Sequence, residues 1–245
     1  MPHETHRKAS SNAGLLFSYL ASVKILAVSD PHGNPEHFAW ISKQRADLIL
    51  LAGDIASIDE DRDRARAWLL HLPVPAAICS GNHDWDYGDC RWLYELRHGR
   101  LLVDQAGCLS GIPIVALPWP TADDDAWIEG CRAAKRIGKL KLPWILLSHT
   151  PPAGSGLAAR DGDFEALALD LADCIRPRVA VCGYWLECPG VWRSSTGSLW
   201  INPGQSSGAV PNHAWISWRE GHPVVRLVEH RSIRAHRARD LKDTR

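Results

Sequence analysis

Four apolar segments of the chain are each followed by residues that commonly bind metal ions. In chain order these residues are Asp30, His32, Asp54, Asn82, His83, Asp84 and His149. A carboxylate can bridge two cations, asparagine offers a neutral oxygen and histidine offers a nitrogen, so the mixture suits Mn, Fe or Zn better than Ca or Mg. Two such cations held close together can bind a phosphoryl group and activate water. The residue types therefore predict a hydrolase that uses one or two divalent metal ions.

The segments that precede these residues are predicted to be buried strands. Their ranges are 24–29, 47–52, 76–79 and 144–148. Two segments with apolar residues at helical spacing, 35–46 and 59–72, separate the first three strands and predict parallel β-α-β units. In open α/β sheets the carboxyl ends of parallel strands border one crevice. We therefore expect the polar residues that follow these strands to converge there.

The rest of the chain is predicted to supply further strands and helices. Strands are expected over residues 101–103 and 112–117, joined by residues 107–111 as a hairpin that could enter a second sheet. The other expected elements are helices over 89–97, 127–137 and 164–175 and strands over 179–182, 191–193, 199–201, 214–218 and 224–229. The loop 118–125, which contains Trp119 and consecutive acids, could border a substrate cleft or begin a helix with acidic residues.

These motifs resemble those of the calcineurin-like metallophosphoesterases. The matching blocks are Asp30-Pro31-His32-Gly33-Asn34, Gly53-Asp54, Gly81-Asn82-His83-Asp84 and Ser148-His149-Thr150-Pro151-Pro152, and they occur in the order of the family. Asn202-Pro203-Gly204 resembles a segment that often follows the last block of the family, so the resemblance covers residues 24–205. It implies an α/β fold, a four-layer α/β/β/α sandwich of two mixed sheets.

The resemblance also implies a role for each metal-type residue. Asp54 would bridge two metal ions. Asp30 and His32 would hold the first ion, and Asn82 and His149 would hold the second. The substrate implied is a phosphate ester.

Two further residues of the third block are predicted to be catalytic. By the same resemblance, His83 would face the phosphate, where an imidazole can stabilise charge or protonate the leaving oxygen. Asp84 would orient His83, and a loop-capping role for Asp84 is the alternative.

The final block of the family, Gly-His-x-His, is altered in this chain. The corresponding sequence is Gly183-Tyr184-Trp185-Leu186-Glu187, so Tyr184 and Leu186 stand where the family has metal-binding histidines. Leucine cannot bind a metal ion, and tyrosine does so only as a phenolate, which requires a strongly acidic metal. Metal binding is therefore expected to be weakened, the second ion being lost first. The candidates for a replacement ligand are Glu187, Cys182, Cys188 and His213.

Composition limits the classes of function. Lys plus Arg and Asp plus Glu are equal at 28 each, so no broad basic field favours nonspecific binding to nucleic acid. The seven cysteines are odd in number and form no Cys-x-x-Cys pair, which favours reduced thiols in a cytoplasmic protein. No apolar run approaches the roughly 18 residues needed to span a bilayer, so no membrane partner is expected.

The chain is interpreted as a single catalytic-type domain with two extensions. Residues 1–22 form the N-terminal extension, residues 23–230 the domain and residues 231–245 a basic tail. The predicted function is hydrolysis of a phosphate mono- or diester by a metal-bound water. The alternative is a catalytically impaired protein of the same fold that acts as a protein-interaction scaffold. Nonspecific nucleic-acid binding is a third, weaker interpretation.

Overall fold

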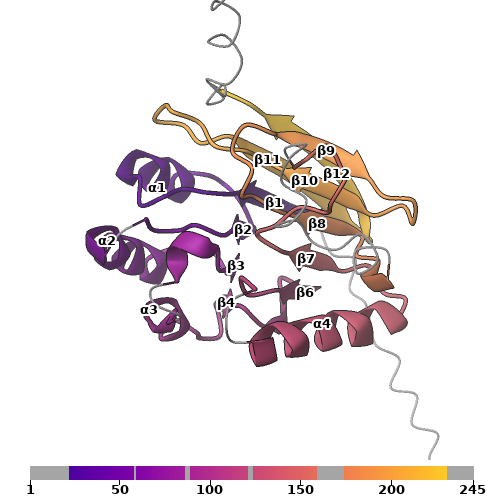
Figure 1. Ribbon diagram of the computed structural model, residues 1–245. Coiled ribbons are helices and arrows are strands. Elements are labelled where there is room, and N and C mark those ends of the chain that lie inside the picture. Colours follow the sequence, from indigo (N-terminus) through magenta and orange to yellow (C-terminus); the bar gives the residue numbers. More distant parts are fainter. Residues whose placement is uncertain (1–21, 58, 86–88, 121–123, 159–173, 231–245) are drawn as a thin grey trace, which may run out of the picture.

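The structure of the chain is a computed structural model that describes residues 22–57, 59–85, 89–120, 124–158 and 174–230 (Figure 1). The basic tail and the N-terminal extension up to residue 21 lie outside the described residues. Most of the helix expected over residues 164–175 also lies outside them.

Two mixed sheets of six strands each form the centre of the fold. The first sheet has the order β12-β11-β1-β2-β3-β4, and the second has the order β5-β6-β7-β8-β10-β9. The strands of the first sheet are β1 (Val23–Val28), β2 (Leu48–Ala52), β3 (Ala76–Cys79), β4 (Leu101–Val103), β11 (His213–Arg219) and β12 (His222–Val228). The strands of the second are β5 (Ala106–Leu109), β6 (Ile112–Ala116), β7 (Ile145–Leu147), β8 (Val179–Val181), β9 (Gly190–Arg193) and β10 (Leu199–Asn202).

Side chains alternate between two apolar layers on each sheet. In β1, Ile25 packs in the core between the sheets, whereas Leu26 packs in the core on the helical side of the first sheet. In β7, Ile145 and Leu146 divide in the same way between the inter-sheet core and a third core beneath a helix. Each such burial stabilises the fold by about 1.5–3 kcal/mol. The predicted four-layer α/β/β/α sandwich is confirmed.

Helices cover the outer faces of the two sheets. Among the described residues the helices of eight residues or more are α1 (Pro35–Ser42), α2 (Asp59–Leu70) and α4 (Asp124–Lys139), and α3 (Arg91–Tyr94) is a single turn. Figure 1 shows α1, α2 and α3 beside the first sheet and α4 beside the second. No helix in the described part of the chain is long and apolar enough to span a membrane.

The prediction that the strands 101–103 and 112–117 form one hairpin is wrong, because the two strands belong to different sheets. β4 pairs with β3 at the edge of the first sheet, and an additional strand, β5, pairs with β6 in the second. Residues 107–109, expected to be part of a loop, therefore belong to a strand. The turn consists of Ser110 (φ +49°) and Gly111 (φ +75°), whose left-handed backbone is typical of a two-residue hairpin. Gly107 weakens the β signal of this strand, which explains why it was missed.

Candidate metal centre

The loops that follow β1 and β2 are joined by backbone hydrogen bonds. The N–H of Asp30 donates to the carbonyl of Gly53 at 3.1 Å, and the N–H of His32 donates to the carbonyl of Asp54 at 2.9 Å. Asn34 then caps α1, because its Oδ1 accepts the N–H of Glu36 at 2.9 Å. The loops therefore hold Asp30, His32 and Asp54 in a fixed arrangement at the carboxyl ends of two neighbouring parallel strands.

Asp54 lies at the centre of a compact group of acids and imidazoles. Its Oδ2 is 3.4 Å from Nε2 of His149 and 3.7 Å from Nε2 of His32, and Nε2 of His149 is 3.8 Å from Oδ1 of Asp30. Asn82 lies between Gly81 and His83, and the N–H of His83 donates to Oδ1 of Asp54 at 2.9 Å. The structure thus brings the five predicted metal ligands to one edge of the sheets. These five residues, Asp30, His32, Asp54, Asn82 and His149, are called the Asp54 cluster below.

Two sets of three side chains in this region could each hold a cation. One set is His32, Asp54 and His83, and the other is Asp30, Asp54 and His149. Within each set the potential ligand atoms lie within 4.8 Å of one another. Asp54 belongs to both sets, which is the position that a bridging carboxylate must occupy.

Three polar atoms of the Asp54 cluster are buried without a hydrogen-bond partner. They are Oδ2 of Asp30, Oδ1 of Asn82 and Nε2 of His149. A buried polar atom without a partner costs about 1–3 kcal/mol, so most such atoms in native proteins are paired. An oxygen, an amide oxygen and an imidazole nitrogen are all donors to a transition-metal ion. The residues therefore fit a divalent cation.

The two histidines of the cluster are held by their other ring nitrogen. Nδ1 of His149 donates to the carbonyl of Ala52 at 2.7 Å, and Nδ1 of His32 lies 2.7 Å from Oγ of Ser57. Metal-binding histidines are commonly fixed in this way, because the second hydrogen bond sets the orientation of the ring. In both residues Nε2 is left to face Asp54.

Burial and mutual attraction perturb the acids and imidazoles of the cluster. Burial raises the pKa of Asp30 to about 7. Burial also disfavours the charge of Asp54, but attraction to the imidazolium of His149, 3.4 Å away, holds the pKa of Asp54 below its ordinary value. Burial disfavours the charged form of His149. The negative charges of Asp54 and Asp30 outweigh this effect and raise the pKa of His149 to about 9. Burial lowers the pKa of His32. A cation must therefore compete with protons at neutral pH.

The backbone at the site adopts conformations that side chains seldom adopt. Asp30 (φ +53°), His32 (φ +47°), Asp54 (φ +51°) and Tyr184 (φ +68°) all lie in the left-handed region. For residues other than glycine this costs roughly 1–2 kcal/mol each, and such costs concentrate at functional sites. Their gathering around one group of acids is a second indication that the group is functional.

Gly53 and Gly81 are required by close contacts with the cluster. A Cβ added to Gly53 (φ +84°) would overlap the ring of His149, and one added to Gly81 would overlap Oδ1 of Asp54. In the Gly-Asp and Gly-Asn-His-Asp motifs, the glycine thus leaves room for side chains of the cluster, and the residue after it is of a metal-binding type.

His83 and Asp84 have different environments. The ring of His83 is exposed and lies 5.0 Å from the ring of His32, so it can reach a molecule at the cluster. Asp84 is buried, and its carboxylate accepts the N–H groups of Ile55 at 2.9 Å, Ala56 at 3.2 Å and Gly81 at 2.9 Å. Burial and the charge of Asp54 raise the pKa of Asp84 to about 8, although the N–H donors favour its ionised form. These contacts are the ones that the loop-capping alternative for Asp84 requires.

Tyr184 lies directly beside the cluster. Its N–H donates to Oδ1 of Asp30 at 3.2 Å, and its ring is 5.6 Å from the ring of His149. The ring also contacts Trp119 at 5.3 Å and Trp185 at 5.2 Å. An aromatic wall, formed by Trp119, Tyr184 and Trp185, therefore borders the site where the family pattern has imidazole. The end of loop 118–125 begins α4 at Asp124, as the interpretation of an acidic helix start predicted. Trp119 of the same loop lies 5.7 Å from the ring of His149.

None of the four suggested replacement ligands belongs to the two candidate sets among the described residues. Cys182 is buried, its thiol donates to the carbonyl of Ile201, and burial raises the pKa of that thiol further. Nδ1 of His213 donates to the carbonyl of Pro211, and its ring packs against Trp40. The two others, Glu187 and Cys188, lie on the loop after Trp185.

Two supporting residues were missed in the sequence. Ser57 holds His32, and Nε2 of Gln205 donates to the carbonyl of Asp30 at 3.1 Å. Gln205 directly follows the Asn202-Pro203-Gly204 motif. The motif marked this segment, but nothing in the sequence indicated that Gln205 contacts Asp30. Ser57 gave none, because a lone serine after a strand is common.

Comparison with known proteins assigns the family. Residues 23–183 match the model of the calcineurin-like phosphoesterases. The chain belongs to this family. The match ends at Gly183, directly before Tyr184. The comparison with curated proteins found no match to this calcineurin-like phosphoesterase.

Solved structures of similar fold have low sequence identity to this chain. GAP50, the anchor in the inner membrane complex of Plasmodium, is similar with a TM-score of 0.56 and 11% identity, over 85% of this chain and 84% of that chain. The phosphopantetheinyl hydrolase of Mycobacterium tuberculosis has a TM-score of 0.49 and 16% identity, over 75% and 89%. A novel archaeal phosphodiesterase has a TM-score of 0.47 and 12% identity, over 84% and 99%. At these identities the likeness to GAP50 shows the fold alone.

Proposed function

We propose that this calcineurin-like phosphoesterase hydrolyses a phosphate mono- or diester with the help of one or two divalent cations bound at the Asp54 cluster. The observation that carries the proposal is the set of unpartnered buried atoms on Asp30, Asn82 and His149 beside the carboxylate of Asp54. The mixture of oxygen and nitrogen donors favours Mn, Fe or Zn, and we propose manganese as the first ion to test. When bound, such an ion offsets charge on phosphoryl oxygens and lowers the pKa of water.

The residues of the chain divide the remaining work. Asp54 is shared between the two candidate sets. The N–H of His83 holds its Oδ1 at 2.9 Å, and its Oδ2 lies 3.4 Å from Nε2 of His149. The His83 ring is exposed, so it can reach an oxygen of the ester. We assign it the binding of the phosphate or the protonation of the leaving oxygen, which contributes about 10²- to 10⁴-fold to rates in other enzymes.

Weak metal binding is part of the proposal. Tyr184 and Leu186 remove two imidazoles of the family pattern, and Cys182 and His213 are engaged in other contacts. The family pattern assigns one ion to Asp30, His32 and Asp54, and we propose this occupancy, with a second ion that binds only at high concentration. In the structure Asp30 and His32 fall in different candidate sets that share Asp54, so the proposed ion would draw on both sets. We propose a cytoplasmic location on the ground that each of the seven cysteines, all in the described part, is a free thiol.

A protein-interaction scaffold is the second candidate function. The loss of two metal-binding histidines favours it, and the similar GAP50 is described as an anchor. The two functions predict opposite outcomes for turnover of p-nitrophenyl phosphate and bis-p-nitrophenyl phosphate with Mn²⁺, Zn²⁺, Fe²⁺ or Ni²⁺. Hydrolysis that disappears in Asp54→Asn supports the enzyme. A purified, folded chain that hydrolyses neither ester with any of the four ions supports the scaffold and contradicts the proposal.

A further inference from the structure

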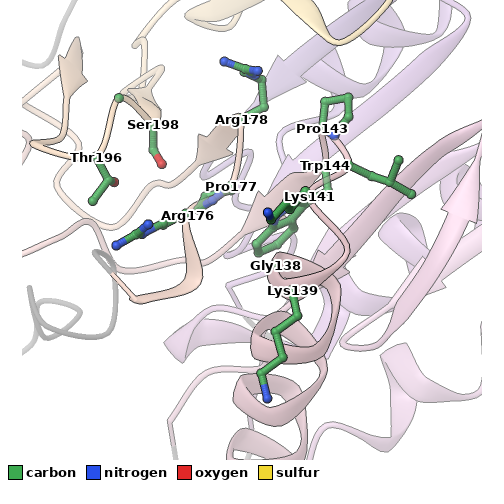
Figure 2. A pocket seen from close by; sticks show the side chains of 12 residues that line it. Gly138, Lys139, Lys141, Pro143, Trp144, Arg176, Pro177, Arg178, Thr196 and Ser198 are labelled. Atoms are coloured by element: carbon green, nitrogen blue, oxygen red, sulfur yellow. The ribbon is translucent and has the colours of Figure 1, made fainter.

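A basic pocket lies on the second sheet at the end opposite to the Asp54 cluster. Its volume is about 550 Å³. The walls come from the C-terminal end of α4, the segment before β7, the segment before β8 and the turn between β9 and β10 (Figure 2). β7 and β8 are parallel, and Trp144 and Arg178 directly precede them, whereas His149 and Gly183 follow them. The pocket and the cluster are therefore separated by the length of these strands.

Positive charge is concentrated around the pocket. Four of the twelve lining residues are cations, Lys139, Lys141, Arg176 and Arg178, and no lining residue is an acid. Because the whole chain has a formal net charge of zero, this is a local excess. Lys139, Lys141 and Arg178 are exposed, and no ion pair joins them to another residue in the described ranges. Such a pocket attracts anions.

Apolar and hydroxyl groups complete the lining. Among the lining residues Trp144 and Pro177 are buried, and Leu142 is 50% exposed. Thr196 and Ser198 supply the hydroxyl-bearing side chains. A volume of about 550 Å³ lies within the usual range for small-molecule sites and exceeds what one inorganic ion fills. Cations and apolar side chains in one lining suit an organic molecule that carries phosphate groups.

The backbone fixes the walls in relation to one another. The N–H of Arg178 donates to the carbonyl of Trp144 at 2.9 Å, and the carbonyl of Arg178 accepts the N–H of Leu199 at 3.3 Å. Lys141 (φ +55°) and Arg176 (φ +47°) adopt the left-handed conformation that favours glycine. Lys141 and Arg176 therefore occupy two positions of the pocket at which the backbone conformation favours glycine.

We propose that this pocket binds an organic phosphate of about the size of a nucleotide, at a site separate from the Asp54 cluster. Figure 2 shows Arg178 and Lys139 extending in different directions, so the positive charges are spread over the lining instead of meeting at one point. This arrangement favours several phosphate groups over one. Trp144 and His149 are five residues apart, which corresponds to roughly 16 Å along an extended strand. The ligand is therefore a second molecule and not the ester at the cluster.

Calorimetry on the full chain tests this site. AMP, ATP and inorganic phosphate are titrated at constant ionic strength in EDTA, which prevents turnover. We expect ATP to bind more tightly than AMP, and inorganic phosphate to bind most weakly. Lys141→Asn with Arg178→Gln should weaken ATP binding on the order of tenfold or more, since charged hydrogen bonds are lost. Asparagine tolerates the left-handed backbone at position 141, and Arg178→Gln alone should give a smaller loss.

Two controls isolate the pocket. Lys135→Gln removes one charge from an exposed position of α4 outside the pocket and should leave ATP binding unchanged. Asp54→Asn should also leave it unchanged, so a failure of the proposed hydrolysis does not affect this result. No ATP binding at millimolar concentration, equal binding of inorganic phosphate, or equal binding by the folded double variant would each overturn the proposal.

Discussion

The backbone N–H of His83 donates a hydrogen bond of 2.9 Å to Oδ1 of Asp54. This bond depends on the backbone and not on the imidazole, so the ring can be removed while the support of Asp54 is kept. We predict that His83→Ala lowers kcat by about 10²- to 10³-fold and changes Mn²⁺ affinity by less than about twofold. Steady-state kinetics and calorimetry measure the two quantities. A large loss of Mn²⁺ affinity would instead identify His83 as a ligand, as its grouping with His32 and Asp54 also allows.

Restoring the altered block should strengthen metal binding. Tyr184→His with Leu186→His returns the two imidazoles of the family pattern, and we expect Mn²⁺ affinity to rise at least about tenfold together with metal-dependent turnover. Trp185→His is the matched control, because it adds an imidazole between the two positions and should give no gain. Unchanged affinity in the double variant would mean that other residues already complete the site.

The stability of the metal-free protein should fall as the pH rises. Burial raises the pKa of Asp30 to about 7, and attraction to Asp54 and Asp30 raises that of His149 to about 9. Both groups bind protons more tightly when folded, so the stability that Asp30 contributes is lost from about pH 4 to 7, and that of His149 from about pH 6.5 to 9. Thermal unfolding in EDTA should show a lower midpoint at pH 9 than at pH 5.

Added Mn²⁺ should reverse this trend, because the cation replaces the protons of the cluster. Asp30→Asn should reduce the pH dependence in EDTA between about pH 5 and 7, and the part that remains is expected from Asp84, whose pKa is raised to about 8. A midpoint that rises from pH 5 to pH 9 in EDTA would contradict the assigned protonation of Asp30 and His149.

Gly81 should not tolerate a side chain. A Cβ there would overlap Oδ1 of Asp54 and lie 2.8 Å from Nε2 of His149. We predict that Gly81→Ala reduces Mn²⁺ affinity more than about tenfold and destabilises the fold by about 1–3 kcal/mol. Gly99→Ala is the matched control, since nothing lies within 4 Å of its added Cβ. Equal behaviour of the two variants in calorimetry and denaturant unfolding would show that the loop at Gly81 adapts.

The sequence predicted the parts of the fold that rest on continuous apolar runs. β2 and β3 were placed to within one residue because every residue in them is buried. β5 was missed because Ala106, Gly107 and Cys108 are at least partly exposed and Gly107 lacks a side chain, so no apolar pattern marks the strand. Motif order is a stronger signal than propensity, and it led to all five residues of the Asp54 cluster.

Features that depend on tertiary contacts were not predictable in this way. The left-handed backbone of Tyr184 turns its ring toward His149 and Trp119, and no residue pattern signals that conformation. The basic pocket was also missed, because Lys141, Arg178 and Thr196 are far apart in the sequence and meet only through the packing of α4, β7, β8 and β10.

The most direct test of the central claim is a calorimetric titration of Mn²⁺ into the chain and into Asp54→Asn. Asp47→Asn is the matched control, because Asp47 directly precedes β2 and accepts the N–H of Lys24 at the opposite end of these strands. The account predicts that the unmodified chain and Asp47→Asn bind Mn²⁺ equally and that folded Asp54→Asn binds none. Equal Mn²⁺ binding by Asp54→Asn and the unmodified chain would contradict it.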